Sequence, residues 1–235
     1  MCFTGIVYAA TVDSLSLTFQ ASGSLWRDAL VLQDMETNSL WSQVTGECIS
    51  GTLEGKMLDQ FPALHTTYDE FIKLYPDGLI LRKPGRGYAV SSYESYFSDE
   101  TKLGIFGRPD NFQRLGGKDK VIGLRLGDNQ TAVSEDYLQT NGYAVIPEAK
   151  PPVVITFDSE TRTAAAFLLP GTGPTGATKI RVETGRILLP GKNISWDAKT
   201  GRVVEGGGDD LKMVPAITSY WFAWISFFPS TRLIK

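Results

Sequence analysis

The chain has 235 residues, of which 42% are hydrophobic and 11% aromatic, so it can bury a core and does not have the composition of a disordered protein. Its net charge of −3 at pH 7 gives no reason to expect binding to nucleic acid or to an anionic membrane, and no stretch reaches the ~18 apolar residues of a membrane span. With 24 glycines, 12 prolines and few helical runs, the composition favours a mainly β fold with a few short helices, with α+β as the alternative.

The first predicted unit is a series of strands and tight turns that leads into a short helix. The stretch DMETNSLW (34–41) is typical of a turn that enters a strand, and Thr45-Gly46 predicts a tight turn to the next strand. In TTYDEFIKLYP (66–76), Thr67 and Glu70 have the spacing of a capping box, and Pro76 prevents continuation of the helix.

Two hairpins are predicted in the rest of the chain. KVIGLRLGDNQTAVS (120–134) alternates apolar residues on either side of a Gly-Asp-Asn turn, and residues 153–157 and 164–169 flank a polar turn. RKPGRGY (82–88) and PGTGPTG (170–176) are predicted loops. The second of these is glycine-rich, but it lacks the Gly-Lys-Ser/Thr of a phosphate-binding loop.

One pattern occurs twice: LWSQVTGECISGTLEG (40–55) and ISWDAKTGRVVEGGG (194–208) both contain Trp, Thr-Gly and Gly at the same spacing. The register continues with one two-residue gap to Pro76 and Pro229, and the matched pairs include Asn38 with Asn193, Trp41 with Trp196, Thr45 with Thr200 and Leu58 with Leu211. We therefore predict two homologous β-rich halves related by a pseudo-twofold. The first unit spans residues 1–84, a connecting region with a hairpin spans 85–150, and the second unit spans 151–235, together in one compact domain.

The second copy ends in an apolar helix, TSYWFAWISFFP (218–229), where the first copy has a polar one. A helix that is apolar on every side is expected to be buried. We therefore predict that Trp221 and Trp224 lie in the core.

Several motifs carry a resemblance to a known family. They are TGIVYAA (4–10), SLWSQVTG (39–46), KVIGLRLGDNQTAVSEDYL (120–138) and WFAWISFFP (221–229). With these motifs the chain resembles, over nearly its whole length, the family called "domain of unknown function 3179". The resemblance implies a bacterial or archaeal protein, exported in many members, and it implies no established activity.

The family pattern also concerns the start of the chain. The family commonly has a Cys-x-x-Cys ahead of the first unit, and Cys2 matches its second cysteine. The second copy supports this frame, because Thr161 to Phe167 spans the same steps as Cys2 to Tyr8. The resemblance implies a partner cysteine upstream of Met1, so we expect the sequence to start within the motif, as a UGA selenocysteine codon at that position would explain. No signal peptide precedes Cys2, and the localisation is left open.

Three residues are candidates for chemistry. Cys2 is a nucleophile or metal ligand, or else an inert residue at a frayed end. Cys48 is its redox or disulfide partner, or an inert cysteine that fills the place of Val203 in the second copy. His65, the only histidine, is a base or a second ligand, or else an ordinary surface residue. The helix that starts near Tyr68 is expected to favour the neutral form of the histidine.

Three further residues are candidates for binding: Thr4, Trp41 and Gln43. Trp41 is otherwise a core anchor of the repeat, and Gln43 is replaced by alanine in the second copy. With one histidine, a multi-histidine zinc site within the chain is excluded.

Two functions from different classes follow. The first is a thiol- or selenol-based redox or metal-handling protein that uses Cys2 and His65, with its cofactor and substrate left open. The alternative is a non-enzymatic module that binds a ligand, such as a small molecule or a thiol, or a partner in an aromatic pocket between the halves.

Overall fold

The computed structural model describes residues 2–81, 94–105, 114–170, 180–191 and 193–235, and the fold that they form is mainly β with short helices. This confirms the prediction of a mainly β fold with a few short helices. The predicted loop at 82–88 lies outside the described residues, as does the predicted loop at 170–176 apart from its first residue.

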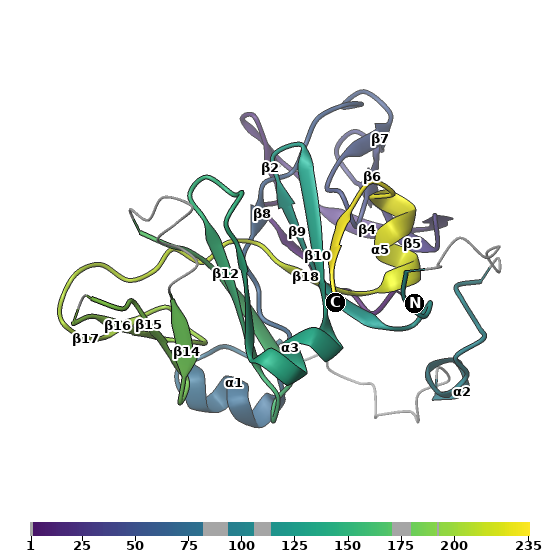
Figure 1. Cartoon of the computed structure of the whole chain (residues 1–235). Helices are drawn as coiled ribbons and strands as arrows, with labels where there is room; N and C mark the ends of the chain where they lie inside the picture. Colours follow the sequence, from purple (N-terminus) through teal and green to yellow (C-terminus); the bar gives the residue numbers. More distant parts are fainter. Residues whose placement is uncertain (1, 82–93, 106–113, 171–179, 192) are drawn as a thin grey trace.

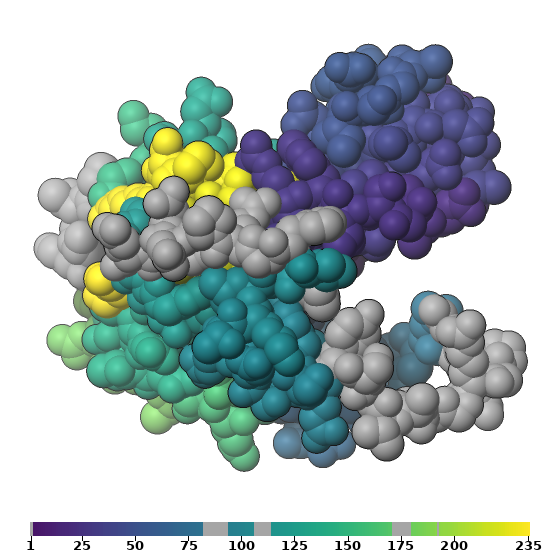
Figure 2. Space-filling model, turned by 90° about the vertical axis from the view of Figure 1, so that its right-hand side faces the viewer, coloured from purple at the N-terminus to yellow at the C-terminus, as the bar shows by residue number. Residues whose placement is uncertain are grey.

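The first strands form two small ribbons and one four-stranded antiparallel sheet. The ribbons pair β1 (Val7–Tyr8) with β8 (Gln60–Phe61) and β2 (Thr11–Val12) with β3 (Leu15–Ser16). The sheet, which we call the N-terminal meander, consists in spatial order of β4 (Phe19–Trp26), β5 (Ala29–Asp34), β6 (Leu40–Ser42) and β7 (Cys48–Ser50). In Figure 2 these residues gather into a lobe that lies beside the yellow C-terminal segment.

Two sheets form the middle of the molecule. One consists in spatial order of β18 (Ile217–Tyr220), β9 (Lys120–Leu126), β10 (Asn129–Ser134) and β19 (Arg232–Ile234). The other consists of β11 (Tyr143–Ile146), β12 (Val153–Asp158) and β13 (Thr163–Leu168). Both predicted hairpins are confirmed, as β9–β10 and β12–β13. The strand β19 runs parallel to β10, so the C-terminal segment closes one edge of the central hairpin while β18 covers the other.

A second meander follows near the C-terminus. The C-terminal meander consists in spatial order of β14 (Arg181–Glu183), β15 (Arg186–Leu188), β16 (Ser195–Asp197) and β17 (Val203–Glu205). Figure 1 shows the two meanders on opposite sides of the central strands.

The two meanders share their local geometry. Both have four antiparallel strands in sequential order, and both have a register shift beside the tryptophan, at Trp41 and at Trp196. In both, the Thr-Gly turn closes with a 2.9 Å hydrogen bond from the glycine N–H to the carbonyl four residues before it. The glycine φ is 74° at Gly46 and 72° at Gly201, a left-handed conformation that glycine adopts without steric cost.

The helices are short: α1 (Tyr68–Leu74), α2 (Glu94–Ser98), α3 (Glu135–Asn141) and α5 (Trp221–Phe227). The predicted start of α1 is confirmed, because the Thr67 hydroxyl accepts a hydrogen bond from the Glu70 N–H at 3.3 Å. The helix α1 ends at Leu74, two residues before Pro76, as the proline requires.

The helix α5 is the centre of the largest apolar cluster, as its composition predicts. Trp224 is fully buried and Trp221 is 1% exposed. The Trp224 ring lies directly on the backbone of Gly123 in β9, where a methyl group would overlap it. Its indole N–H donates to the hydroxyl of Thr231 at 2.9 Å. The prediction that both tryptophans are core residues is confirmed.

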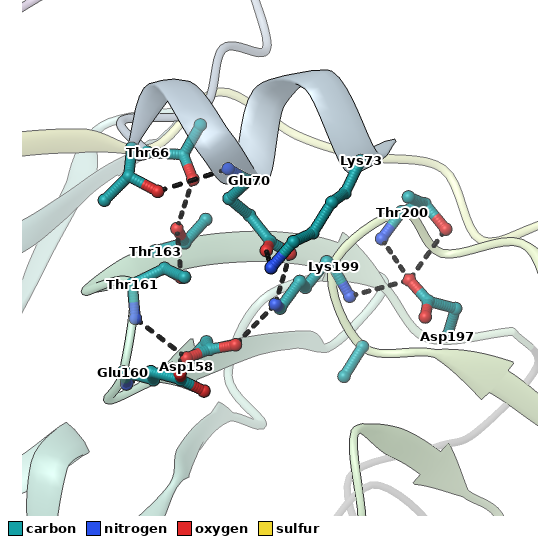
Figure 3. A network of polar contacts seen from close by, with 12 residues as sticks. Thr66, Glu70, Lys73, Asp158, Glu160, Thr161, Thr163, Asp197, Lys199 and Thr200 are labelled. Atoms are coloured by element: carbon teal, nitrogen blue, oxygen red, sulfur yellow. Dashed lines mark hydrogen bonds and ion pairs between the residues drawn. The ribbon is translucent and has the colours of Figure 1, made fainter. Parts of the chain in front are cut away.

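A polar network joins α1 to the second predicted unit (Figure 3). Lys199, in the Thr-Gly turn of the C-terminal meander, forms ion pairs with Glu70 of α1 and with Asp158 at the end of β12, the latter at 2.5 Å. Beside it, the Thr163 hydroxyl donates to the Thr66 hydroxyl at 2.7 Å. Because the Glu70 side chain is only 8% exposed, Lys199 supplies most of the charge that compensates it.

Candidate functional site

The segment that carries Cys2 is held in a folded conformation, although it lies near the start of the chain. Phe3 has a left-handed backbone with φ 57°, an uncommon conformation for a bulky residue, and it turns the chain so that Cys2 Sγ lies 3.2 Å from Thr4 Oγ1. The carbonyl of Cys2 accepts a hydrogen bond from the Tyr220 N–H at 3.0 Å and another from the Ser219 hydroxyl at 3.3 Å. Cys2 is 3% exposed, so it is an ordered, packed residue and not a frayed one.

Strand pairing brings His65 to this segment. The strand β1 pairs antiparallel with β8, which directs the residues after β8 back along the residues before β1. The imidazole of His65 then lies over Gly5, where an added Cβ would be 2.5 Å from Nε2. The ring of Phe3 stands edge-on to the imidazole with 6.1 Å between centroids. Only a glycine at position 5 therefore lets the histidine approach the chain so closely.

A hollow of about 310 Å³ lies where these parts meet, lined by Cys2, Phe3, Thr4, Gln43, His65 and Phe97. Gln43 reaches it from the N-terminal meander, held through its Oε1 by the Leu30 N–H at 3.3 Å, and its amide lies 3.5 Å from the Thr4 hydroxyl. Four of the six residues predicted as candidates, Cys2, Thr4, Gln43 and His65, thus line one cavity. We call it the thiol hollow.

The environment of His65 favours its neutral form. Burial lowers the pKa of His65 below its usual value, and the positive charge of Lys120 lowers it further. The sequence predicted a neutral histidine from the nearby start of α1, whereas burial and Lys120 account for the shift in the structure. At pH 7 the imidazole is therefore available to accept a proton.

The other two candidates lie elsewhere. Trp41 is fully buried in the N-terminal meander, where its indole N–H donates to Asp34 at 2.8 Å. Cys48 pairs across from Trp41 and is 1% exposed, in the position that Val203 takes opposite Trp196. Burial raises the pKa of the Cys48 thiol. Both cysteines are free thiols, and neither Trp41 nor Cys48 lines the thiol hollow.

Two residues near the site gave no signal in the sequence. Phe97 reaches the hollow from α2, and Lys120, at the start of β9, lies with its ammonium 4.2 Å from the centroid of the Phe3 ring. Both are far from Cys2 in the sequence, and no motif marks either of them. The apolar alternation that predicts β9 indicates only that Lys120 begins a strand.

A second cavity adjoins the thiol hollow. It measures about 430 Å³, and it shares Phe3 and His65 with the hollow. Lys120, Glu135 and Arg162 supply its charged groups, and four threonines, at positions 66, 67, 161 and 218, contribute to its lining. Its lining comes from both predicted units, but it is mostly polar rather than aromatic. We call it the basic cavity.

Within the described parts of the chain, no group of three or more His, Cys, Asp or Glu side chains is placed to hold a metal ion. No helix among the described residues is long and apolar enough to cross a membrane.

Comparison with known proteins matches the chain to one family. The family model described as "Protein of unknown function (DUF3179)" matches residues 1–231 of the chain. No curated protein and no solved structure matches the chain.

Proposed function

We propose that this chain, which belongs to the DUF3179 family, carries out thiol–disulfide exchange, with Cys2 as the nucleophile and His65 as the base. The observation that carries this proposal is the shared lining of the thiol hollow by Cys2 and a neutral His65. A thiol must lose its proton before it can attack, and a neutral imidazole in the same cavity can accept that proton.

The reaction balances without a further redox partner. His65 takes the proton of the Cys2 thiol, and the thiolate attacks one sulfur of a small disulfide R–S–S–R. A bond forms between Cys2 and that sulfur while the original S–S bond breaks, and the leaving thiolate takes the proton from His65. A second thiol then attacks the mixed disulfide and releases Cys2. Thr4 and Gln43 position the cysteine, since the Thr4 hydroxyl lies against its sulfur and the Gln43 amide lies behind Thr4.

A metal-handling role has less support. Cys2 and His65 would supply two ligands, and a structural metal site usually needs four. The exchange reaction needs only the pair that the hollow contains.

The test is the reaction of untagged protein with a small aromatic disulfide at pH 7, followed by release of the chromophore and by mass mapping of the adduct. We expect one rapid adduct at Cys2, absent in Cys2→Ser. We expect His65→Ala to slow it by about tenfold or more, because it removes the base. Cys48→Ser is the control, and its rate is expected to match that of the wild type. Slow labelling of both cysteines at equal rates, unaffected by His65→Ala, would refute the proposal.

The second candidate function is a non-enzymatic binding module. The basic cavity favours it, because its walls come from both predicted units and carry charged and hydroxyl groups. Such a module would bind its ligand with equal affinity in Cys2→Ser and in the wild type. A covalent adduct at Cys2 would instead favour the exchange reaction.

We also propose that the two units are copies of one ancestral unit. The shared strand order, register shift and Thr-Gly turn of the meanders support this. The turns at Phe3 and Arg162 also support it. The two residues have φ values of 57° and 53°, and in each turn the side chains on either side of the residue are in hydrogen-bond contact with each other. Superposition of residues 38–76 on residues 193–229 in a crystal structure is expected to show the same strand order. A different order in the two would end the proposal.

A further inference from the structure

Of the two cations that line the basic cavity, only Arg162 forms a close ion pair with a described residue. Arg162 forms an ion pair with Glu135, whose side chain is 5% exposed. Lys120 lies over the ring of Phe3, and among the described residues no acceptor forms a hydrogen bond or a close ion pair with its ammonium. Two cations and one carboxylate leave the cavity with an excess of one positive charge at pH 7, when His65 is neutral. Burial lowers the pKa of Lys120, as expected for an ammonium held away from water.

The hydroxyl groups of the cavity add hydrogen-bond donors. Thr163 donates its proton to the Thr66 hydroxyl, so the proton of Thr66 itself remains to be donated. Within the described part of the chain, the Thr218 hydroxyl has no hydrogen-bond partner, and it lines the same cavity. The single carboxylate of the lining, Glu135, forms its close ion pair with Arg162, and its charge also acts on Lys120 from a longer distance. The cavity thus offers an ammonium and hydroxyl donors, a combination that suits a small oxyanion.

The cavity also lies beside the candidate nucleophile. Phe3 and His65 line both the basic cavity and the thiol hollow, so a small molecule could occupy the two spaces at once. A ligand with an anionic group in the basic cavity would extend past His65 toward Cys2.

We infer that the basic cavity is the binding subsite for a carboxylate, and that the thiol or disulfide that reacts at Cys2 carries this carboxylate a few bonds from its sulfur. The second half of the inference rests on the exchange reaction proposed above. Lys120 supplies the charge, and Thr66 and Thr218 supply hydroxyl donors. The subsite gives the reaction a substrate class: small acidic thiols and their disulfides, in preference to neutral or basic ones.

The first experiment compares two alkylating reagents of nearly equal size, iodoacetate and iodoacetamide, on the Cys48→Ser protein. The ratio of the two Cys2 rate constants isolates the effect of the carboxylate. We expect Lys120→Met to lower the iodoacetate-to-iodoacetamide ratio by about tenfold, and Lys120→Arg to restore most of it. Lys102→Met is the matched control, because Lys102 is an exposed lysine paired with Asp99 outside both cavities. An equal ratio in Lys120→Met and in the wild type would overturn the inference.

A second experiment separates carboxylate binding from cysteine chemistry. His65 is the only histidine of the chain, so its imidazole gives a single Hε1 signal in the proton NMR spectrum of untagged protein. Titration with propionate is expected to shift this signal to saturation in the wild type and to leave it nearly unchanged in Lys120→Met, whereas propionamide is expected to have little effect. Saturable binding of propionate with an unreactive Cys2 would uphold the subsite and refute the exchange reaction. No response to propionate would refute the subsite even if Cys2 reacts rapidly.

Discussion

Trp224→Ala is expected to lower the free energy of unfolding by about 3–5 kcal/mol, the range measured when large aromatic side chains are removed from packed cores. The ring is fully buried, lies on Gly123 and packs against Phe228 with 4.4 Å between centroids. Glycine at position 123 has no side chain that could expand into the vacated space. The indole N–H is also lost, which leaves the buried hydroxyl of Thr231 without its donor.

Denaturant titration monitored by circular dichroism measures this change. Tyr68→Ala is a suitable control, because Tyr68 is an aromatic residue of the helix α1 with 64% of its surface exposed. We expect the control to change stability by less than about 0.5 kcal/mol. A loss below about 1 kcal/mol for Trp224→Ala would mean that the C-terminal helix does not pack in the core.

Lys199→Met is expected to lower the free energy of unfolding by about 2–3 kcal/mol, somewhat less than the loss of a fully buried pair, because the lysine is 24% exposed. The substitution keeps most of the aliphatic length of the side chain but removes the charge that compensates Glu70 and Asp158 (Figure 3). The Glu70 carboxylate, 8% exposed, then remains buried without its main partner.

Lys73→Met is the matched control for this prediction. Lys73 contacts the same carboxylate at 3.8 Å, but its side chain is 74% exposed, so water replaces it at little cost. We expect the control to lose less than about 0.5 kcal/mol. Equal losses for the two variants would show that the network contributes no more than a surface ion pair.

The contribution of the network depends on pH in a defined direction. Burial alone would raise the pKa of Asp158, but the hydrogen bonds from Lys199 and from backbone N–H groups outweigh it and lower that pKa. Burial likewise opposes the charged form of Lys199, yet its two carboxylate partners raise its pKa. The stability from Asp158 is present above its unfolded pKa of about 3.9 and is lost as the pH falls through the folded value, while that from Lys199 is lost only above about pH 10. The stability difference between wild type and Lys199→Met should be constant from about pH 5 to 9 and shrink on further acidification.

Local patterns in the sequence predict much of the fold. The hairpins at β9–β10 and β12–β13, the cap of α1 at Thr67 and the buried helix α5 all follow from periodicity and turn chemistry within a few residues. The parallel pairing of β19 with β10 does not, because no local signal specifies which distant strand an edge will accept.

The sequence repeat made part of the candidate site predictable. Gln43 and His65 differ from their counterparts Ala198 and Thr218, and that difference indicates a role in the first copy only. The approach of His65 to Cys2 depends on the pairing of β1 with β8 and on the bare backbone of Gly5. Lys120 and Phe97 could not be predicted as site residues from the sequence, because they reach the site only through tertiary packing.

The backbone partners of Cys2 have a consequence for synthesis on the ribosome. Its carbonyl is held by Ser219 and Tyr220, more than two hundred residues later in the chain. Translation proceeds from the N-terminus, so the Cys2 segment of the nascent chain lacks these two partners until those residues emerge. During that interval Cys2 meets the oxidants and disulfides of its compartment as an ordinary thiol, without the base and the hollow of the folded site, and the release of the C-terminal strands completes that site. Ribosome-bound chains stalled before residue 217 should therefore label at Cys2 with the rate of an unfolded thiol.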